Sequence, residues 1–597
     1  MPDVPVHPLL ASTFTIVALA SLALGGCVEE DATLAPPDEA LAEVDDVPAD
    51  APNPPGSSAR IVGAACPSLA PITSRTAPVR GTTTPGLPLP YPACQTPVVI
   101  ALRSCANNPS CRDVRAFGAT ADDDVDDTAA IQRAIDAAPA GGVVYLPAGR
   151  YVIDQDVAAV HLRADRAIAQ ARFGLQLRGR RDLHLVGDGD DRTILEDHFS
   201  QDAFDAASAH DLAVFVGTIF VEGSADVTIG RLGLVSTGGF SCAMAPYAGR
   251  VDGIRAEATT RLTVTEVAAR HYNSAGVSIT DDAGVRSLDP KVANNLLQQN
   301  RVAGLLIGHT TGALIVHNRF YNNGRHGNGE TAYGMAASAA EPPIDTTVRC
   351  NLADYNVRKG LDFHAALGQT RIVNNASIGS GVAGIFVSGS ADRLGGTITI
   401  DQNRVATMSP AVTDAIHGLG ASGTGAGVVG IWTYPKFTTA SSTAPTIVIK
   451  NNTIEDFTAA GGTQSFAPFQ LRAEAHSTGS TTVWNNVVKA GVVRQFIMTN
   501  TPATSGGQTF HVRGNTLSYE RTASPAGVAA QPFIALSKAS SVTVVGNTFT
   551  AAGAPATADQ WDDAAIQRSG TCSLGLTQKV YGAAPTTCVV TGNRWVR

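Results

Sequence analysis

The sequence predicts an all-β fold: a single-stranded right-handed parallel β-helix, a solenoid with a short N-terminal capping helix. Three observations lead to this prediction. A polar rung repeats along the chain, an asparagine closes strand after strand, and a glycine opens many strands. Patterns that recur every few tens of residues are typical of a solenoid in which successive coils stack on one another.

The repeating rung is clearest at Asn351–Gly360. The upstream segment Asn318–Gly327 aligns with it without a gap, and Asn375 and Gly384 keep the same nine-residue separation downstream. Segments that match at one offset and share a polar cluster are expected to form neighbouring coils.

An asparagine follows short strands rich in Val, Ile and Leu throughout the chain. Asparagine tolerates left-handed backbone geometry, and its amide can hydrogen-bond along a stack of turns. We therefore predict an asparagine ladder that stabilises successive coils and performs no chemistry. Its members are Asn300, Asn318, Asn375, Asn403, Asn452, Asn486, Asn515, Asn547 and Asn593.

The third pattern is a glycine followed by alternating residues at the start of a strand. Side chains alternate across a strand, so the second and fourth residues of each segment are predicted to point inward and the third and fifth outward. The outer face then forms a strip on which charged and aromatic residues gather. The segments begin at Gly253, Gly276, Gly304, Gly334, Gly360, Gly384 and Gly430.

Residues 1–27 contain the apolar run Thr15–Leu24, which is short for a membrane span and typical of an export signal. The ending Leu24-Gly-Gly-Cys27 resembles a bacterial lipoprotein signal, in which the cysteine is lipidated. No Lys or Arg precedes the apolar run, so simple secretion and a wrongly assigned start are alternatives. We expect an exported protein, either a bacterial outer-membrane lipoprotein or an extracellular protein, that meets the membrane only through a lipid anchor.

The segments that follow differ in composition. Residues 28–59 are acidic and Pro-rich, which predicts a disordered linker, residues 60–112 form a cysteine-containing preamble, and residues 113–597 form the β-helix domain. Ten of the 52 acids but no base lie before Arg60, so the remainder, with 42 acids and 43 bases, is near neutral. This balance predicts no nucleic-acid partner and no basic membrane patch.

Eight of the nine cysteines remain after Cys27, and an even number in an exported chain favours disulfides. Cys242 and Cys350 lie several coils apart, at about 4.8 Å per coil, so we predict that they are separate buried thiols. The sequence contains neither a CxxC nor an HExxH motif, so we do not expect a structural zinc site. The other six are Cys66, Cys94, Cys105, Cys111, Cys572 and Cys588.

The start of the β-helix domain carries a family signature. Within Asp113–Asp136, Asp127 and Thr128 can cap a helix, and the strands of Gly141–Ile153 follow around a Pro-Gly turn. These two segments resemble the N-terminal signature of the pectate-lyase-like (rhamnogalacturonase/epimerase-like) right-handed parallel β-helix family. The resemblance implies a helix that caps the open end of the solenoid. It implies little about chemistry, because the superfamily holds lyases, hydrolases, epimerases and phage tailspikes.

The acidic run Asp122–Asp127 admits two interpretations. Capping and turn formation explain these acids, and a calcium loop is the alternative. Calcium is therefore a possible cofactor, and no other metal is expected.

The candidate catalytic residues are Arg358, Lys359, Asp362 and His364. Asp362 and His364 share the outer face of one strand, and the two cations stand at the turn before it. The chain has only seven lysines, so a lysine beside an arginine is unusual here. A surface ion pair or a stacked polar ladder would explain the same residues without chemistry.

Substrate-binding residues are predicted on both sides of this group. The gap-free alignment places Arg325 and His326 at the positions of the two cations, one coil away. Phe386, Trp432 and Tyr434 on the outer face predict a stacking platform for sugar rings. Two further candidates stand in the loop before Gly334, namely Tyr333 and Glu330.

Two reactions on a polysaccharide fit these residues. β-Elimination on a uronate polymer needs cations that neutralise the sugar carboxylate and a base that removes the C5 proton. Arg358, Arg325 and His326 would serve the first role. Lys359 or His364 would serve the second, and Asp362 could orient His364. Hydrolysis needs a second carboxylate, which Asp354 or Glu330 would have to supply.

The positive cluster favours elimination, so we predict an exported lyase with an acidic polysaccharide as its partner. A glycoside hydrolase on the same scaffold is one alternative. A non-catalytic glycan-binding or structural surface protein is another.

Overall fold

The computed structural model describes residues 91–154, 161–162, 168–170, 174–198, 213–237, 250–280, 284–324, 332–337, 342–390, 392–407, 428–435, 445–456, 466–472, 479–490, 497–500, 509–520, 534–537, 541–552, 578–581 and 587–596. The predictions for residues 1–59 lie outside the described residues. So do those for individual side chains at Cys66, Cys242, Arg325, His326, Glu330 and Cys572.

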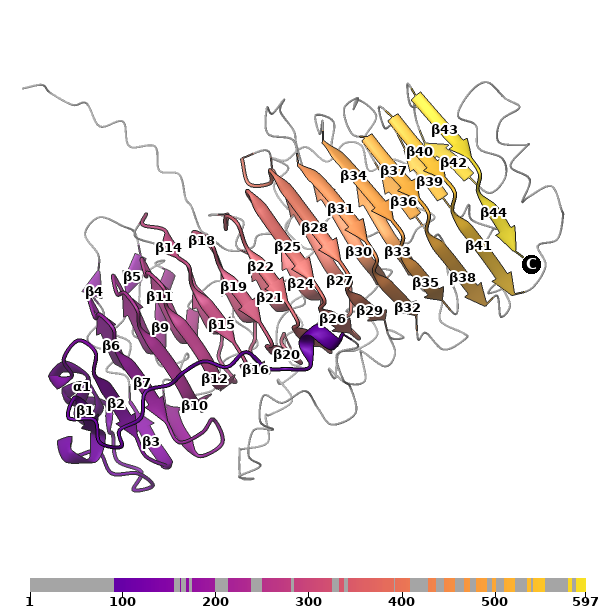
Figure 1. Cartoon of the computed structure of the whole chain (residues 1–597). Helices are drawn as coiled ribbons and strands as arrows, with labels where there is room; N and C mark the ends of the chain where they lie inside the picture. Colours follow the sequence, from indigo (N-terminus) through magenta and orange to yellow (C-terminus); the bar gives the residue numbers. More distant parts are fainter. Residues whose placement is uncertain are drawn as a thin grey trace, which may run out of the picture.

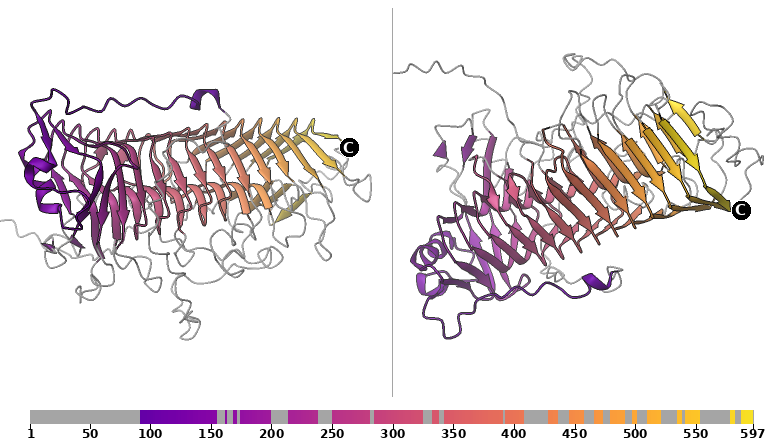
Figure 2. Two further views of the ribbon diagram at one scale, coloured as in Figure 1. Left: turned by 90° about the horizontal axis from the view of Figure 1, so that it is seen from below. Right: turned by 45° about the horizontal axis from the view of Figure 1, so that its top comes forward.

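Strands stack in register along one axis, as Figure 1 and Figure 2 show. Among the described strand pairs, all are parallel except the pair β4 and β5. Each coil contributes strands to a 27-stranded sheet and to a 15-stranded sheet. This is the parallel β-helix that the sequence predicts, and parallel strands follow one another through right-handed crossovers as a rule.

The 27-stranded sheet consists of two series of strands that share the long strands β10 (Thr228–Ser236) and β12 (Thr263–Arg270). The first series also contains β1 (Cys111–Asp113), β2 (Val143–Leu146), β7 (His184–Gly187), β15 (Lys291–Ala293), β19 (Leu314–Val316), β22 (Thr347–Arg349), β25 (Gln369–Val373), β28 (Thr397–Asp401), β31 (Thr446–Lys450), β34 (Ser480–Trp484), β37 (Thr509–Arg513), β40 (Ser541–Val545) and β43 (Thr587–Thr591). The second contains β3 (Gly149–Ile153), β8 (Thr193–Asp197), β16 (Leu296–Gln298), β20 (Arg319–Tyr321), β23 (Leu352–Asp354), β26 (Ala376–Ile378), β29 (Arg404–Thr407), β32 (Thr453–Asp456), β35 (Val487–Ala490), β38 (Thr516–Glu520), β41 (Thr548–Ala552) and β44 (Arg594–Val596).

The 15-stranded sheet forms the remaining face of the coils and carries the strip predicted from the glycine pattern. A separate small sheet pairs β14 (Ser287–Leu288) with β18 (Thr310–Thr311). The strands of the 15-stranded sheet are β4 (His161–Leu162), β5 (Ile168–Gln170), β6 (Leu175–Arg178), β9 (Ala213–Glu222), β11 (Arg250–Glu257), β13 (Ala275–Ile279), β17 (Ala303–Ile307), β21 (Tyr333–Ala337), β24 (Lys359–Phe363), β27 (Ala383–Gly389), β30 (Val428–Pro435), β33 (Phe466–Arg472), β36 (Ile497–Asn500), β39 (Ile534–Ser537) and β42 (Gln578–Tyr581).

Ten asparagines form a continuous ladder that runs along the coils. At Asn351, the backbone amide and Nδ2 both donate to Oδ1 of Asn375, at 2.9 and 3.0 Å, and its own Oδ1 accepts the same pair from Asn318. The ladder asparagines are fully buried except the last, and each satisfies a carbonyl of the coil interior as well. The full ladder is Asn295, Asn318, Asn351, Asn375, Asn403, Asn452, Asn486, Asn515, Asn547 and Asn593.

The predicted ladder is thus present, with two corrections. Asn300 belongs to a second, shorter ladder with Asn323 and Asn356. The ladder asparagines are not the left-handed residues either, because positive φ falls on the residue just before each one, such as His317 at 55° and Cys350 at 57°. The preceding residue makes the turn, and the asparagine side chain fills the corner.

The strand-opening glycines have a steric cause. A Cβ on Gly334 would lie 2.5 Å from the carbonyl oxygen of Gly360 and 2.8 Å from Nδ2 of Asn356. Gly304 meets the oxygen of Gly334 in the same way, at 2.7 Å. Because the coils approach so closely here, only glycine fits beside the short asparagine ladder.

The helix α1 (Thr128–Ala137) lies at the first end of the stack, and its buried residues Ala130, Ile131, Ala134 and Ile135 join the main core. The helix is therefore present where the sequence predicts it, whereas its capping role stays a prediction. Asp127 is at the N-cap position without a capping hydrogen bond, because its Oδ1 accepts from the amide of Thr120.

The preamble turns back along the solenoid. Residues 91–110, which we name the strap, run along one side of the stack between the short helix η1 (Pro92–Cys94) and β1, as Figure 2 shows. Arg103 binds Asp182 at 2.6 Å, and the carbonyl of Val98 accepts from Nδ2 of Asn294 at 2.7 Å. The strap therefore bridges coils that are far apart in sequence.

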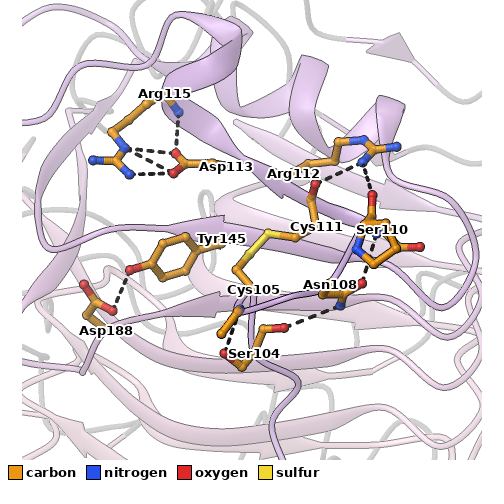
Figure 3. Close-up of a disulfide and its surroundings, with 12 residues drawn as sticks. Ser104, Cys105, Asn108, Ser110, Cys111, Arg112, Asp113, Arg115, Tyr145 and Asp188 are labelled. Carbon is orange, nitrogen blue, oxygen red and sulfur yellow. Dashed lines mark hydrogen bonds and ion pairs between the residues drawn. A yellow bond between two sulfur atoms is a disulfide. The ribbon is translucent and has the colours of Figure 1, made fainter.

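A disulfide joins Cys94 in the strap to Cys350, with a Cα–Cα distance of 5.3 Å. The prediction that Cys350 is a free buried thiol is therefore wrong, because the strap brings a preamble cysteine to the middle of the stack. A second disulfide, Cys105–Cys111, closes a tight loop at the start of the solenoid (Figure 3). In the described part of the chain, no helix is long and apolar enough to cross a membrane.

Candidate active site

The register of the 15-stranded sheet aligns the outward residues of neighbouring coils. Asp362 lies between Ala336 of β21 and Phe386 of β27, and Phe386 lies beside Trp432 of β30. This is the order that the glycine alignment predicts. The coil with Arg358, Lys359, Asp362 and His364 is therefore flanked by small residues on one side and by aromatic residues on the other.

The same register corrects the gap-free alignment. Tyr333 pairs with Lys359, and the amide of Arg358 donates to the carbonyl of Ala332. The residues one coil before the two cations are therefore Ala332 and Tyr333, because extra residues separate the asparagine ladder from β21 in this coil. The predicted substrate-binding roles of Arg325 and His326 concern residues outside the described ones.

Lys359, Asp362 and His364 meet on the outer side of β24. Oδ2 of Asp362 lies 2.8 Å from Nε2 of His364 and 3.7 Å from Nζ of Lys359. The His364 contact is close, but its geometry is not that of a hydrogen bond, and neither oxygen of Asp362 accepts a hydrogen bond within the described structure. We name these three residues, with Arg358 and Tyr333, the Lys359 cluster.

Aromatic rings enclose this cluster. The ring of His364 packs edge to face against Tyr333, at 6.0 Å between centroids, and against Phe386, at 5.4 Å. Phe386 in turn packs against Trp432 at 4.9 Å. Nζ of Lys359 lies 3.7 Å from the centroid of the Phe386 ring, which is a close cation–π contact.

The whole group is buried. Lys359 is 1 % exposed, Asp362 0 %, His364 7 % and Trp432 5 %. The prediction of an open strip with flat aromatic faces is therefore wrong in this respect. The side chains point away from the coil interior as the alternation requires, but they pack edge to face on one another and lie out of solvent.

Burial makes this arrangement costly for a purely structural role. Removing two charges from water costs several kcal/mol per ion unless good geometry and hydrogen bonds compensate. The carboxylate of Asp362 lacks those hydrogen bonds within the described structure. A buried ionisable group whose hydrogen-bonding atoms are not all paired is more typical of a functional site than of a structural one.

The second carboxylate that hydrolysis would need is not supplied by Asp354. This residue lies in β23 of the other sheet, and Arg319 binds its carboxylate at 2.6 Å. Burial raises the pKa of Asp354, although Arg319 opposes the shift. Its role is a buried ion pair on the wall of the solenoid.

A second buried charged group lies farther up the same sheet. Nε of Arg255 donates to Glu257 at 2.7 Å, and its Nη1 lies 3.4 Å from Asp252. Asp252 also accepts from the amide of Ala275. Arg255 is four strands from Asp362 in the register, roughly 19 Å along the axis, so the two groups do not form one site.

The acidic run near α1 is engaged by backbone groups. Asp122 accepts from the amide of Arg150, and Asp126 accepts from the amides of Thr128 and Asp154. No group of three or more His, Cys, Asp or Glu residues in the described segments could hold a metal ion. The turn and capping interpretation therefore fits this run better than a calcium loop.

One residue of the site was missed at the sequence level. Gln470 lies beside Trp432 in the register, on the same outward line as Asp362 and Phe386. Its strand begins without the glycine that marks the other segments, so the alignment stopped one coil too early.

Comparison with known proteins supports the predicted resemblance. Residues 111–225 match the family model described as rhamnogalacturonase A/epimerase, pectate lyase-like, which covers the segments that carry the signature. Two relatives come from Azotobacter vinelandii. Mannuronan C5-epimerase AlgE2 is 29% identical over 223 residues, and alginate lyase 7 is 27% identical over 225 residues.

Each alignment covers 36% of this chain, but 20% and 23% of the two relatives, so the chain matches about a fifth of their length. Among solved structures, the A-module of Azotobacter vinelandii mannuronan C-5 epimerase AlgE6 is 16% identical, with a TM-score of 0.41. The match covers 81% of this chain and 99% of that one.

Proposed function

We propose that the protein is a polysaccharide lyase that cleaves a uronic-acid-containing polysaccharide by β-elimination at the Lys359 cluster. The observation that carries the proposal is the convergence of a lysine, an imidazole and a carboxylate on one buried strand, with a phenol on the strand before. The relatives named for mannuronan and alginate support an acidic polysaccharide as the substrate.

The reaction needs three functions at neighbouring atoms. A cation must neutralise the carboxylate at C5, which acidifies the C5 proton, and a base must remove that proton. The electron pair then forms the C4–C5 double bond as the C4–O4 bond breaks. An acid must protonate O4 as it leaves, which gives an unsaturated sugar and a new chain end.

Lys359 suits the first function. Its Nζ lies 3.7 Å from Oδ2 of Asp362 and 3.7 Å from the centroid of the Phe386 ring, on the outer side of β24. Arg358 is the adjacent residue and is also buried. Arg358 is therefore a second candidate cation for a carboxylate that enters from the substrate.

His364 suits the second function, and the contact with Asp362 explains why. The carboxylate of Asp362, 2.8 Å from Nε2, places a negative charge beside the imidazolium that would form when His364 takes up the C5 proton. Tyr333, in ring contact with His364, has a hydroxyl that can serve as the acid. Asp362 then does not react with the substrate itself, and its role is to position Lys359 and His364.

Hydrolysis is the second candidate and is less well supported. It requires an acid and a second carboxylate on opposite sides of the scissile bond. Asp362 is the one carboxylate at the Lys359 cluster among the described residues, because Asp354 faces the other sheet. Elimination uses residues that the structure describes, whereas Glu330, the other predicted second carboxylate, lies outside them.

We also propose that the protein is exported and anchored through a lipid on Cys27. The disulfides Cys94–Cys350 and Cys105–Cys111 support an oxidising compartment, where such bonds persist. Radiolabelled palmitate should enter the wild-type chain and not a Cys27→Ala variant. Equal labelling of both would contradict the lipid anchor.

The test of function is the ultraviolet absorbance of the purified chain mixed with a panel of polyuronides. Elimination produces unsaturated uronate, so absorbance should rise with the correct polymer. New reducing ends without a rise in absorbance would instead mean hydrolysis. A change in sugar stereochemistry detected by NMR, without any cleavage, would mean epimerisation, which shares the proton-removal step.

His364→Ala should abolish the absorbance change. Ser388→Ala is the matched control, because Ser388 occupies the corresponding outward position on the next buried strand and has no part in the proposed chemistry. Full activity in His364→Ala would contradict the assignment of the base. Binding of a polymer without any chemical change would favour the glycan-binding alternative.

A further inference from the structure

Two buried polar groups next to the Lys359 cluster lack partners. Nε1 of Trp432 and Oε1 of Gln470 are both buried and make no hydrogen bond within the described structure. The side chains are 5 % and 2 % exposed. Leaving a buried donor and a buried acceptor unpaired disfavours the folded state, so the fold alone gives no reason to keep either.

The two groups occupy adjacent positions on one line. Trp432 pairs with Gln470 in the register, and both share the outward line that begins at Asp362 and passes through Phe386. Trp432 is two strands beyond Asp362, which is roughly 10 Å along the solenoid axis. A sugar polymer that lies along the axis with one residue at Asp362 would place another residue of the same polymer here.

We propose that Trp432 and Gln470 form a subsite that binds a hydroxyl group of a second sugar residue of the polymer whose uronate reacts at Asp362, and that this subsite prefers a neutral sugar. The inference rests on the proposed function, since it takes the Lys359 cluster as the place where a uronate binds. The predicted stacking role of Trp432 is replaced by recognition through its N–H group.

The chemistry of the pair determines the preference. An indole N–H only donates and an amide oxygen only accepts, whereas a sugar hydroxyl does both. One hydroxyl, or two on adjacent carbons, can therefore satisfy both groups. An ionised carboxylate can accept from Nε1 of Trp432, but it has no proton for Oε1 of Gln470, and the two acceptors would repel each other.

The packing of Trp432 supports this role over stacking. Its ring meets Phe386 at an interplanar angle of 80°, so the aromatic side chains interlock. Phe386 in turn lies under Nζ of Lys359. The indole is therefore held in place by the residue that also contacts the cluster, which fixes the spacing between the two subsites.

The test uses mannuronate hexasaccharides in three forms: unreduced, with about half of the carboxylates reduced to alcohols, and fully reduced. Carboxyl reduction keeps the ring stereochemistry and replaces charge with a hydroxyl. Binding is measured by calorimetry to the full chain that carries His364→Ala, so that no ligand is consumed. The half-reduced form should bind about fivefold to tenfold more tightly than the unreduced form.

Two variants locate the preference. Trp432→Phe removes the N–H and keeps a ring, and Gln470→Met removes the acceptor at similar length. Each should bring the two affinities to within about twofold of each other. Thr433→Val is the control, because Thr433 follows Trp432 on β30, is buried and, by alternation, lies on the opposite face of the strand, so its loss should leave the preference unchanged.

The outcomes separate this inference from the proposed function. Tightest binding of the unreduced form, or a preference that Thr433→Val abolishes and Gln470→Met does not, would overturn the subsite. Tightest binding of the fully reduced form would instead show that the Lys359 cluster does not bind a carboxylate. Should either variant fail to fold, the order of the three ligands on the parent chain still decides the matter.

Discussion

The asparagine ladder and the Lys359 cluster are both buried rows of polar side chains on the same solenoid, yet they are built in opposite ways. In the ladder, each amide is neutral and uses both its donor and its acceptor on the neighbouring coils. In the cluster, charged groups meet within one coil and the carboxylate of Asp362 keeps unused capacity. The ladder repeats over ten coils, whereas the Lys359 cluster belongs to one coil of the described part of the chain.

This difference indicates what each row does. A repeated, fully satisfied amide stabilises every coil equally, because its hydrogen bonds replace those that water would have made. A single charged group with unused hydrogen-bonding capacity contributes little to stability and leaves capacity for a ligand. We therefore assign a stabilising role to the asparagine ladder and a chemical role to the Lys359 cluster on the outer side of β24.

The largest expected effect comes from removing the charges of the cluster. The double variant Lys359→Met/Asp362→Leu should lose at least about 1000-fold in turnover, equivalent to about 4 kcal/mol. Its free energy of unfolding should stay within about 1 kcal/mol of wild type or rise, because apolar residues of similar volume replace a buried ion pair. Absorbance kinetics and urea unfolding measure the two quantities.

A double variant that unfolds at much lower urea would mean that the cluster is structural after all. The single variant Asp362→Asn, which keeps the shape of the side chain, provides a second readout of activity. Retained turnover in both variants would remove Asp362 from the mechanism.

The reverse effect is expected in the ladder. Asn351→Ala removes the five hydrogen bonds of the side chain: Oδ1 loses two donors from Asn318, and Nδ2 no longer donates to Oδ1 of Asn375 or to the carbonyls of Ile315 and Arg349. Because several buried groups lose their partners, unfolding free energy should fall by about 3 kcal/mol. Turnover of the folded fraction should change less than twofold.

The control for the ladder variant is Asn485→Gly. Asn485 is an exposed residue with φ of 53°, and glycine occupies the equivalent left-handed position at Gly514 and Gly546. This substitution should cost less than about 1 kcal/mol. Equal destabilisation by both variants would mean that the turn, and not the buried amide, carries the stability.

The Cys94–Cys350 disulfide is expected to contribute to stability and not to turnover, as the asparagine ladder does. Cys350 is the left-handed residue just before ladder residue Asn351, so the strap is fixed to the stabilising corner and not to the site. The double variant Cys94→Ser/Cys350→Ser should lose about 2–4 kcal/mol of unfolding free energy. Its turnover at low temperature should match wild type, and a large loss of turnover would link the strap to the site.

Repetition made much of this molecule predictable from the sequence. The parallel strands, the asparagine ladder and the outward line through Asp362, Phe386 and Trp432 all follow from local rules of side-chain alternation and coil stacking. Each rule acts within one coil and its neighbour. A repeated pattern can therefore be recognised from the sequence, because each coil provides another example of the same rule.

The features that the sequence did not predict depend on contacts between distant segments. The strap places Cys94 beside Cys350 although 256 residues separate them, and no repeat records that path. The extra residues before Tyr333 shifted one alignment, because insertions at a corner leave the coil without changing its register. Alternation showed which way His364 points, but it could not show that the side chain is buried.

The smallest expected effect concerns protonation at the ladder corner. Burial and the neighbouring Arg349 lower the pKa of His317, which occupies the left-handed position before Asn318. The folded state thus binds fewer protons at this side chain than the unfolded state, whose pKa is about 6.5. The stability that this neutral histidine provides is present above pH 6.5 and is lost as pH falls through that value.

His317→Asn should reduce this loss, because asparagine occupies the same position at Asn374 and Asn451 and does not titrate. Between pH 7 and pH 5, the unfolding free energy of the variant should fall by less than that of wild type, by up to about 1 kcal/mol. Turnover at pH 7 should be unchanged, since His317 precedes a ladder asparagine and lies away from β24. Identical pH dependence of unfolding in the two proteins would mean that His317 is equally easy to protonate in the folded and unfolded chain, and that the ladder corner tolerates a charge as the Lys359 cluster does.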